Sequence, residues 1–350
     1  MKIRRDIKLA YKISIMLFIL IVVTVGSIMF GTVSISIDDC IKIIGSHIPG
    51  LNQLIHADGI KESHIIIVMN LRLPRIILAL FVGMGLSAAG CVYQGVFSNP
   101  MADPYLIGIS SGAALGATIA MLFPISNRFL AFGSVSTFAF LGAITTMVFV
   151  FFIAKNKNSL PKIALILAGI AINYFIASLI ALLMMFNKEK IESVYFWTLG
   201  SFRDASWLKL GFLGAIVIIA FIVIYKYYVE LNMIMVNEEQ ALTLGVSTEK
   251  VKRILLVVAS LMVAVIVSTC GIIGFVGLIT PHATRLVVGA NHKVLIPIST
   301  ILGGIFMVVA DTIARSILPN AEISVGIITA LFGVPFFLAL LYKNKKLIVQ

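Results

Sequence analysis

The residues of this chain that could take part in chemistry are mostly paired charges. Arg72 and Arg75 stand three residues apart, on either side of Leu73-Pro74, where a long apolar run begins. Two arginines at this spacing share one face of a helix and can offer paired N–H donors to a carboxylate. Snorkelling anchors at a membrane surface use the same residue types. The pair predicts either a docking point for an acidic protein surface or an interfacial anchor.

A second charged pair lies inside an apolar run near the end of the chain. Asp311 and Arg315 are four residues apart, which is the spacing of an ion pair within one helix. Such a pair lets an apolar helix tolerate both charges at membrane depth. Arg315 is also near the predicted helix end, so it could meet an outside partner, and Glu322 in the next loop is a further candidate mate.

A proline-rich turn separates two apolar runs at residues 99–104, with the sequence NPMADP. Prolines donate no backbone hydrogen bond and push the preceding residue out of helical geometry. A plain turn is one interpretation, and a rigid constriction beside a transport route is the other. The small residues of the following SSGAALGA run favour close helix packing over contact with a transported molecule.

The polar stretch 238–246 contains three apolar residues among polar neighbours, Ala241, Leu242 and Leu244. One interpretation is an amphipathic helix lying on the membrane surface. The other is a contact with a cytosolic motor subunit.

The motifs expected of an enzyme are absent from the sequence. It contains neither a GxxxxGK[ST] phosphate loop nor an HExxH zinc motif, and its five histidines are isolated. Its three cysteines form no CxxC pair. The sequence predicts no catalytic residue, metal site or cofactor, and if ATP drives the protein, another chain must bind it.

The elements that position these residues are long apolar segments. The chain has 350 residues, of which 60% are hydrophobic and 12% charged, whereas soluble proteins are about 25% charged. Runs of about 20 apolar residues are long enough to cross a bilayer, and the first run lacks a signal-peptide cleavage site. We expect an all-α polytopic membrane protein, one transmembrane domain over residues 1–350, with about ten helices near 11–33, 71–95, 105–123, 129–153, 163–186, 207–228, 253–272, 275–290, 294–317 and 325–343.

The charges predict the topology. With both termini in the cytoplasm, most of the 27 Lys and Arg residues fall in inner loops, as the positive-inside rule requires. Merging the seventh and eighth segments would move the basic C-terminal tail outside, so we expect two separate helices. The same rule explains the net charge of +12 without nucleic acid. An outer segment at 34–64 could hold a short surface helix, and the inner loop 230–252 is expected to form two short helices around a glycine turn at Gly245.

Several ordered motifs resemble one transport family. They are LRLPR (71–75), FVGMGLSAAG (81–90), NPMADPYLIGISSGAALGA (99–117), LAGIAI (167–172), WTLGSF (197–202), ALTLGV (241–246), GIIGFVGLITPHATRLVVGANHKVLIP (271–297), ADTIAR (310–315) and EISVGIITALFGVPFF (322–337). Together they resemble the FecCD/BtuC-like permease family. These proteins are the transmembrane subunits of ATP-binding-cassette (ABC) importers for iron–siderophore, haem or cobalamin.

The resemblance implies the partners and the roles of the candidate residues. It implies a type II importer permease with ten helices per subunit, paired with a second permease copy or a paralogue. Cytoplasmic ABC ATPase subunits and an extracellular or periplasmic substrate-binding protein complete the complex. Residues matching the binding-protein docking arginines are Arg72, Arg75 and Arg315; those matching the cytoplasmic gate are Asn99 and Met101; those matching the ATPase coupling segment are Glu238, Glu239, Ala241, Leu242, Leu244 and Gly245.

A second part of the gate corresponds to residues 159–163. The match is poor there, because Lys162 and Ile163 replace the small polar residues often found in the family. Residues 1–70 match only in being a helix followed by an outer segment.

The cargo is open at this stage, with ferric siderophore expected before haem and cobalamin. An ion-coupled secondary transporter or channel working without an ATPase is the alternative, and such a protein usually has acids or broken helices near the bilayer centre. The only group of charges that the sequence places at membrane depth is Asp311, with Arg285 and Arg315 nearby. It would have to serve as the ion-coupling site of such a transporter. A membrane scaffold without transport would leave the inner loop and the outer arginines unexplained.

Overall fold

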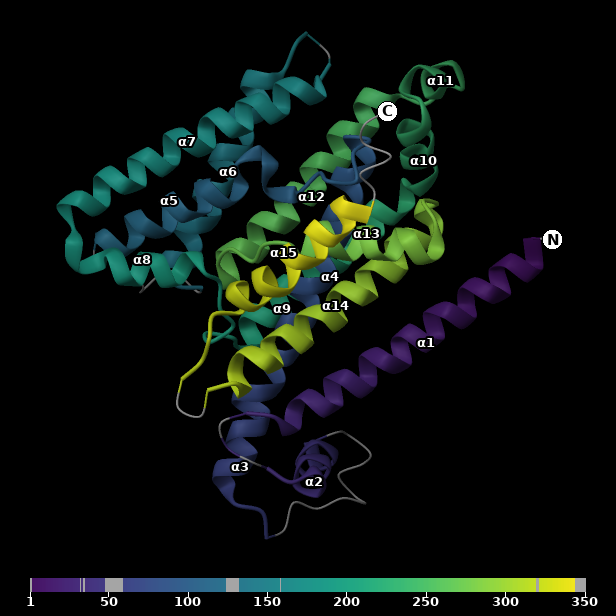
Figure 1. The fold of residues 1–350 in the computed structure, drawn as a ribbon. Coiled ribbons are helices and arrows are strands. Elements are labelled where there is room, and N and C mark those ends of the chain that lie inside the picture. The colour runs from purple at the N-terminus through teal and green to yellow at the C-terminus, as the bar shows by residue number, and fades with distance from the viewer. Residues whose placement is uncertain are drawn as a thin grey trace.

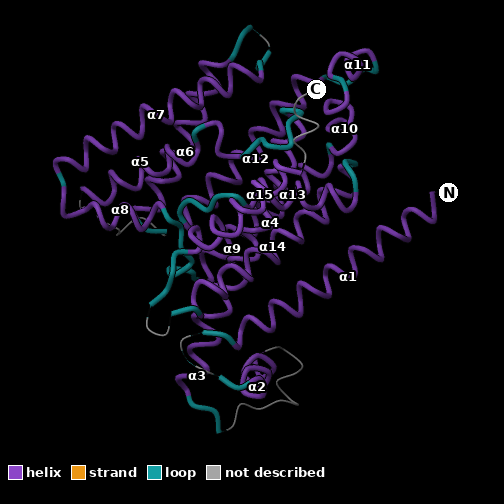
Figure 2. Tube along the Cα trace, viewed as in Figure 1, coloured by secondary structure: helices purple, strands orange, loops and turns teal. Residues whose placement is uncertain are grey.

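The computed structural model describes residues 2–31, 33, 35–47, 59–123, 132–157, 159–318 and 321–343. Long helices lie roughly side by side in one tilted bundle, and α1 runs along its flank (Figure 1). Helices joined by short loops make up nearly all of this described part of the chain (Figure 2). This confirms the all-α prediction.

The first half of the described chain forms α1 (Lys2–Met29), α2 (Ile37–His47), α3 (Glu62–Ile66), the π-helix η1 (Ile67–Arg72), α4 (Leu73–Val96), the 3-10 helix η2 (Pro104–Ile107), α5 (Ile109–Leu122), α6 (Ser134–Ala154) and α7 (Lys162–Phe186). The second half forms the 3-10 helix η4 (Lys188–Lys190), α8 (Ile191–Thr198), α9 (Trp207–Lys226), α10 (Tyr228–Val236), α11 (Glu238–Thr243), α12 (Thr248–Cys270), α13 (Val276–Val288), α14 (His292–Ser316) and α15 (Val325–Lys343).

Each of the ten predicted apolar segments corresponds to one helix, although the predicted 129–153 segment begins outside the described residues. Seven helices of the described chain are long and apolar enough to cross a membrane. The other three, α5, α13 and α15, are shorter. At a rise of 1.5 Å per residue, the 13 residues of α13 cover about 20 Å of a hydrocarbon core that is about 30 Å thick.

Helix α4 forms the centre of the bundle, packed against α9, α12, α13 and α14 (Figure 1). Its backbone comes into direct contact with two neighbours because glycines face each other there. A Cβ atom on Gly83 would collide with the carbonyl oxygen of Gly303 on α14, and one on Gly90 with that of Gly277 on α13. Small residues permit this close approach in membrane proteins, where packing drives helix association.

Helices α5, α6, α7 and α8 form a second group on one side of α4 (Figure 1). Gly112 and Gly116 of α5 lie directly against the backbone of α6 at Gly142 and Phe138. The small residues of this run therefore pack helices, as the sequence predicted.

Several of the predicted inner loops contact one another at one end of the bundle, where α10 and α11 lie (Figure 1). The loop before α7 contacts the region around α11, and α10 contacts the loop before α14. The contacts are Lys162–Glu238, Leu160–Glu249 and Asn232–Asn291. We call this the coupling end.

The described loops before α9 and α15 lie at the opposite end, toward α2 and α3 (Figure 1). Its polar contacts are Arg75–Glu322, Arg203–Glu322 and Trp207–Met69. We call this the arginine end. The structure thus separates the two sets of loops as the charge pattern predicted, while the side of the membrane that each faces stays a prediction.

Several predicted boundaries are wrong in detail. The second apolar helix begins near Glu62, because α3, η1 and α4 form one continuous 35-residue span. The short surface helix predicted in 34–64 is present as α2, although residues 34 and 48–58 lie outside the described part. In the loop 230–252, α11 precedes a turn at Gly245, which has a left-handed φ of +85°. The second helix expected there is the first turn of α12.

The seventh and eighth segments are separate helices, as predicted. Residues 271–275 between them are not helical, and Gly271 and Phe275 have positive φ values of +75° and +70°.

Candidate functional site

The three predicted docking arginines lie around one cavity at the arginine end. This cavity has a volume of about 360 Å³. Arg72 reaches it from the end of η1, Arg75 from the first turn of α4, and Arg315 from the end of α14. Arg203 and Glu322 complete its charged lining.

Arg75 is held by two carboxylates. Its Nε and Nη2 donate to Asp311 Oδ1 over 3.0 and 2.9 Å, and its Nη1 donates to Glu322 Oε2 over 2.9 Å. Only 12% of the Arg75 side chain and 1% of that of Asp311 are exposed. Asp311 also pairs with Arg315, at 3.5 Å from its Nε, so the predicted ion pair within one helix is confirmed.

Arg72 and Arg315 are buried and cap the end of α1. Arg72 Nη1 donates to the carbonyl oxygen of Ile28 over 2.7 Å, and its Nη2 donates to that of Val33. Arg315 Nη2 donates to Ser27 Oγ over 2.7 Å, and its Nη1 donates to the carbonyl oxygen of Phe30. The last carbonyls of a helix have no partner within it and carry partial negative charge, which cations satisfy.

These contacts change the interpretation of the docking set. A partner carboxylate could engage Arg72 or Arg315 only by replacing carbonyl groups of α1 and the loop after it. Docking through these two arginines stays a prediction.

Arg203 is the exposed cation of this cluster, and the sequence analysis did not select it. Two thirds of its side chain (66%) is exposed, and its Nε lies 3.4 Å from Glu322 Oε2. The sequence feature that could have identified Arg203 is its position directly after the WTLGSF motif. Burial raises the pKa of Glu322, but attraction and hydrogen bonds from Arg75 and Arg203 outweigh it, so the pKa lies below its ordinary value.

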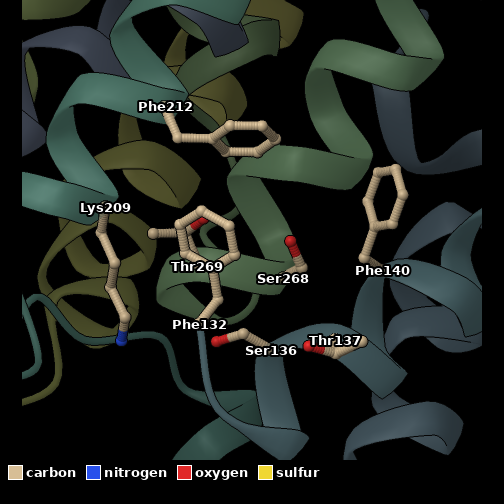
Figure 3. A pocket seen from close by; sticks show the side chains of 8 residues that line it. All are labelled: Phe132, Ser136, Thr137, Phe140, Lys209, Phe212, Ser268 and Thr269. Carbon is tan, nitrogen blue, oxygen red and sulfur yellow. The ribbon is translucent and has the colours of Figure 1, made fainter. Parts of the chain in front are cut away.

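A larger cavity of about 450 Å³ adjoins Arg203 and Glu322 and extends to Lys209. Lys209 also lines a small neighbouring cavity of about 130 Å³ between three phenylalanines, shown in Figure 3. The hydroxyl groups of Thr137, Ser268 and Thr269 there donate to carbonyl oxygens of their own helices or helix caps. The small cavity is therefore mainly a packing feature.

At the coupling end, the predicted gate residues Asn99 and Met101 lie in one turn. Asn99 Oδ1 accepts a hydrogen bond from the Met101 backbone N–H over 2.9 Å. Asn99 is exposed and Met101 is half-buried. The turn joins the end of α4 to η2, where Asp103 Oδ1 accepts from the N–H of Tyr105.

Helix α11 presents part of the predicted coupling surface. Leu242 and Leu244 are 53% and 70% exposed, and Glu239 and Gly245 are also exposed. Ala241 is buried, and α11 packs against α10 and α12. Its predicted place in the contact surface stays a prediction.

Ion pairs fix α11 to its surroundings. The Lys252 side chain is 4% exposed and lies between the carboxylates of Glu238 and Glu249. Glu238 also pairs with Lys162 over 3.4 Å. Burial raises the pKa of Glu238, but the hydrogen bond from Lys252 and attraction to both lysines outweigh it and lower the pKa below its ordinary value.

The two predicted parts of the gate meet through Lys162. Its Nζ lies 3.2 Å from Ser98 Oγ, beside the Asn99–Met101 turn. The backbone N–H of Leu160 donates to Glu249 Oε2 over 2.8 Å. The structure therefore joins the gate turn, the loop before α7 and the start of α12.

An apolar cavity of about 650 Å³ lies beside the irregular residues 271–275, between the end of α8 and α15. Irregular backbone at membrane depth is tolerated where it is buried in protein or lines a cavity. The glycine-rich break is visible in the sequence, but its position beside α15 depends on tertiary packing.

Within the described residues, no group of three or more His, Cys, Asp or Glu side chains could hold a metal ion. The three cysteines are buried and unpaired.

Comparison with known proteins gives consistent matches. The FecCD transport family matches residues 19–343. The cobalamin import system permease protein BtuC of Halobacterium salinarum is 42% identical over 287 residues, 82% of this chain and 76% of that protein. The molybdate import system permease protein MolB of Haemophilus influenzae is 35% identical over 341 residues, 97% of this chain and 96% of that protein.

A solved inward-facing structure of a metal-chelate type ABC transporter has the same fold. Its TM-score is 0.81 at 33% identity, covering 95% of this chain and 98% of that chain. The family match and the relatives cover most of the sequence, and the solved structure covers the bundle. The chain therefore belongs to the FecCD transport family.

Proposed function

We propose that this chain forms half of the membrane pore of an ABC importer for a metal chelate. A second permease copy or paralogue forms the other half, and ATP is hydrolysed by separate cytoplasmic subunits. The observation that carries the proposal is the exposure of Leu242 on α11 and of Leu244 directly after it. These two exposed leucines lie on and directly after a short helix that ion pairs hold in place. Such an exposed apolar surface could insert into a cleft of the ATPase subunit.

The orientation follows from the same proposal. The coupling end and both chain termini face the cytoplasm, and the arginine end faces outward to meet a binding protein. The distribution of Lys and Arg along the sequence supports this orientation.

Ferric siderophore is the first candidate for the cargo, followed by haem and cobalamin. Relatives named for cobalamin, hemin and iron chelatin support a metal chelate, and one named for molybdate widens the range. The cavity beside residues 271–275 has an apolar lining. Such a lining would suit the wall of a transport route that does not bind a bulky chelate tightly.

The contacts of Asp311 speak against an ion-coupled secondary transporter. An ion-coupling carboxylate must exchange its proton or cation during transport. Asp311 is instead enclosed by Arg75 and Arg315, whose side chains occupy the positions beside the carboxylate that an exchangeable ion would need.

Reconstitution in lipid vesicles tests the proposal. The permease is inserted with or without its ATPase and binding protein, and uptake of iron-loaded ferrichrome, hemin and cyanocobalamin is measured. We expect accumulation of one chelate only when ATP, the ATPase and the binding protein are all present. Gradient-driven accumulation by the permease alone would replace the proposal with the secondary-transporter alternative.

A further inference from the structure

Lys162 occupies the space between the coupling helix and the gate turn. Its Nζ lies 3.4 Å from Glu238 Oε2, on the first residue of α11, and 3.2 Å from Ser98 Oγ, at the end of α4. About a quarter of the Lys162 side chain is exposed. One ammonium group, which has three N–H donors, thus touches both elements.

Ser98 adopts a backbone conformation that normally selects glycine. Its φ is +51°, its N–H bonds to the carbonyl oxygen of Gly95, and the N–H of Asn99 bonds to that of Gln94. This pattern is a Schellman motif with Ser98 at the left-handed position, which is usually glycine. A side chain there is unfavourable by itself, so the contact of its hydroxyl with Lys162 is a reason for a serine.

The other end of the link is firmly anchored. Glu238 contacts the buried ammonium of Lys252 as well as Lys162. Glu249 contacts Lys252 and also the Leu160 N–H. A displacement of α11 would therefore move the start of α7, because their side chains are already in contact.

We propose that Lys162 is a positioning residue that transmits movement of α11 to the gate turn at 98–101. The inference rests on the proposed function, because it needs an ATPase acting on α11. It adds a role at a position where the sequence departs from the small polar residues of similar permeases. Lys162 acts through Ser98 and does not need to touch the cargo.

The experiment follows the gate turn without requiring a known cargo. The permease carries Met101→Cys and is purified with its ATPase in lipid nanodiscs. The labelling rate of this cysteine by the thiol reagent MTSET is measured with and without Mg-ATP, and ATP hydrolysis is measured in parallel. The native cysteines are buried and provide a low background.

We expect ATP to change the labelling rate in the Met101→Cys complex. Lys162→Met and Ser98→Gly should each shrink this change by at least about fivefold, the lower end of typical coupling between sites, while ATP hydrolysis continues. Ser98→Gly relieves backbone strain, so a loss in this variant does not come from unfolding. Lys162→Arg should restore the change, and Lys155→Met, in the exposed part of the same loop, should leave it intact.

The link through Lys162 and the proposed function would be contradicted by different results. If Lys162→Met and Ser98→Gly both keep the full ATP-dependent change, the link through Lys162 is wrong and the proposed function stands. If the Met101→Cys permease neither binds an ATPase nor responds to ATP, the proposed function fails and the inference fails with it.

Discussion

Arg75 on α4 and Asp311 on α14 face each other with two N–H donors aligned on one carboxylate, although 236 residues separate them in the sequence. Arg75 also binds Glu322, and Asp311 also meets Arg315. The arginine end is therefore an ion network that joins α4 and α14, two helices that also pack backbone to backbone at Gly83 and Gly303.

Removing the Asp311 carboxylate should destabilise the protein strongly. Asp311→Asn leaves Arg75 and Arg315 without their shared buried counter-charge, and breaking a buried pair costs about 3–5 kcal/mol. Thermal unfolding of the detergent-purified protein measures the loss. Asp38→Asn, which removes an exposed pair with Lys42, is the control and should not shift the melting temperature. Equal melting temperatures for the two variants would show that the network does not stabilise the bundle.

Charge reversal at Arg203 should weaken docking of the binding protein. Arg203→Glu places a negative charge on the exposed rim, and a rim charge mainly changes the association rate and its salt dependence. Association with the permease in nanodiscs is measured at low and high salt, with Lys188→Glu as the control. Unchanged association at low salt would exclude Arg203 from the docking surface.

A charge on the exposed leucines of α11 should uncouple the ATPase. Leu242→Asp or Leu244→Asp would bring a carboxylate into an apolar contact, where an unpaired charge is costly. Co-purification of the ATPase and ATP-driven uptake should fall together. Thr243→Asp puts the same charge on an exposed position of α11 and should have a smaller effect. If all three variants behave alike, charge rather than the leucine surface determines coupling.

The contribution of Glu322 to stability should disappear in acid. Its pKa is lowered from an ordinary value of 4.5 by Arg75 and Arg203, against the opposing effect of burial. A lowered pKa in the folded state stabilises the protein above the ordinary pKa, and this contribution is lost as the pH falls through the folded value. The stability difference between wild type and Glu322→Gln should be constant above about pH 5 and shrink below pH 4.5. A difference that grows in acid would contradict this sign.

Much of the fold could be predicted from the sequence, because it depends on local composition. Apolar runs of membrane length gave the ten helices, and the basic loops gave the separation into two ends. The start of the second apolar helix at Glu62 and the joining of the helix after Gly245 to α12 were not predicted, since a π-helix and a helix start depend on neighbouring contacts as well as on local pattern.

The candidate site was predictable only in part. Spacing placed Arg72 and Arg75 on one helix, but the carbonyl groups that hold Arg72 belong to α1 and the chain just after it. Leu242 was correctly expected on the surface. Ala241 is buried, which the sequence did not indicate, because a short helix gives too little periodicity to tell its packed face from its exposed face.

The sequence alone determined that this is an all-helical membrane protein with charges sorted to its two ends, because the bilayer acts on each segment according to its length and polarity. The tertiary structure decided which charges are satisfied and which stay exposed. Arg203 and Lys162 acquired their candidate roles only when the chain brought Glu322, Glu238 and Ser98 beside them. Such pairings depend on the close packing of distant helices, which no local pattern encodes.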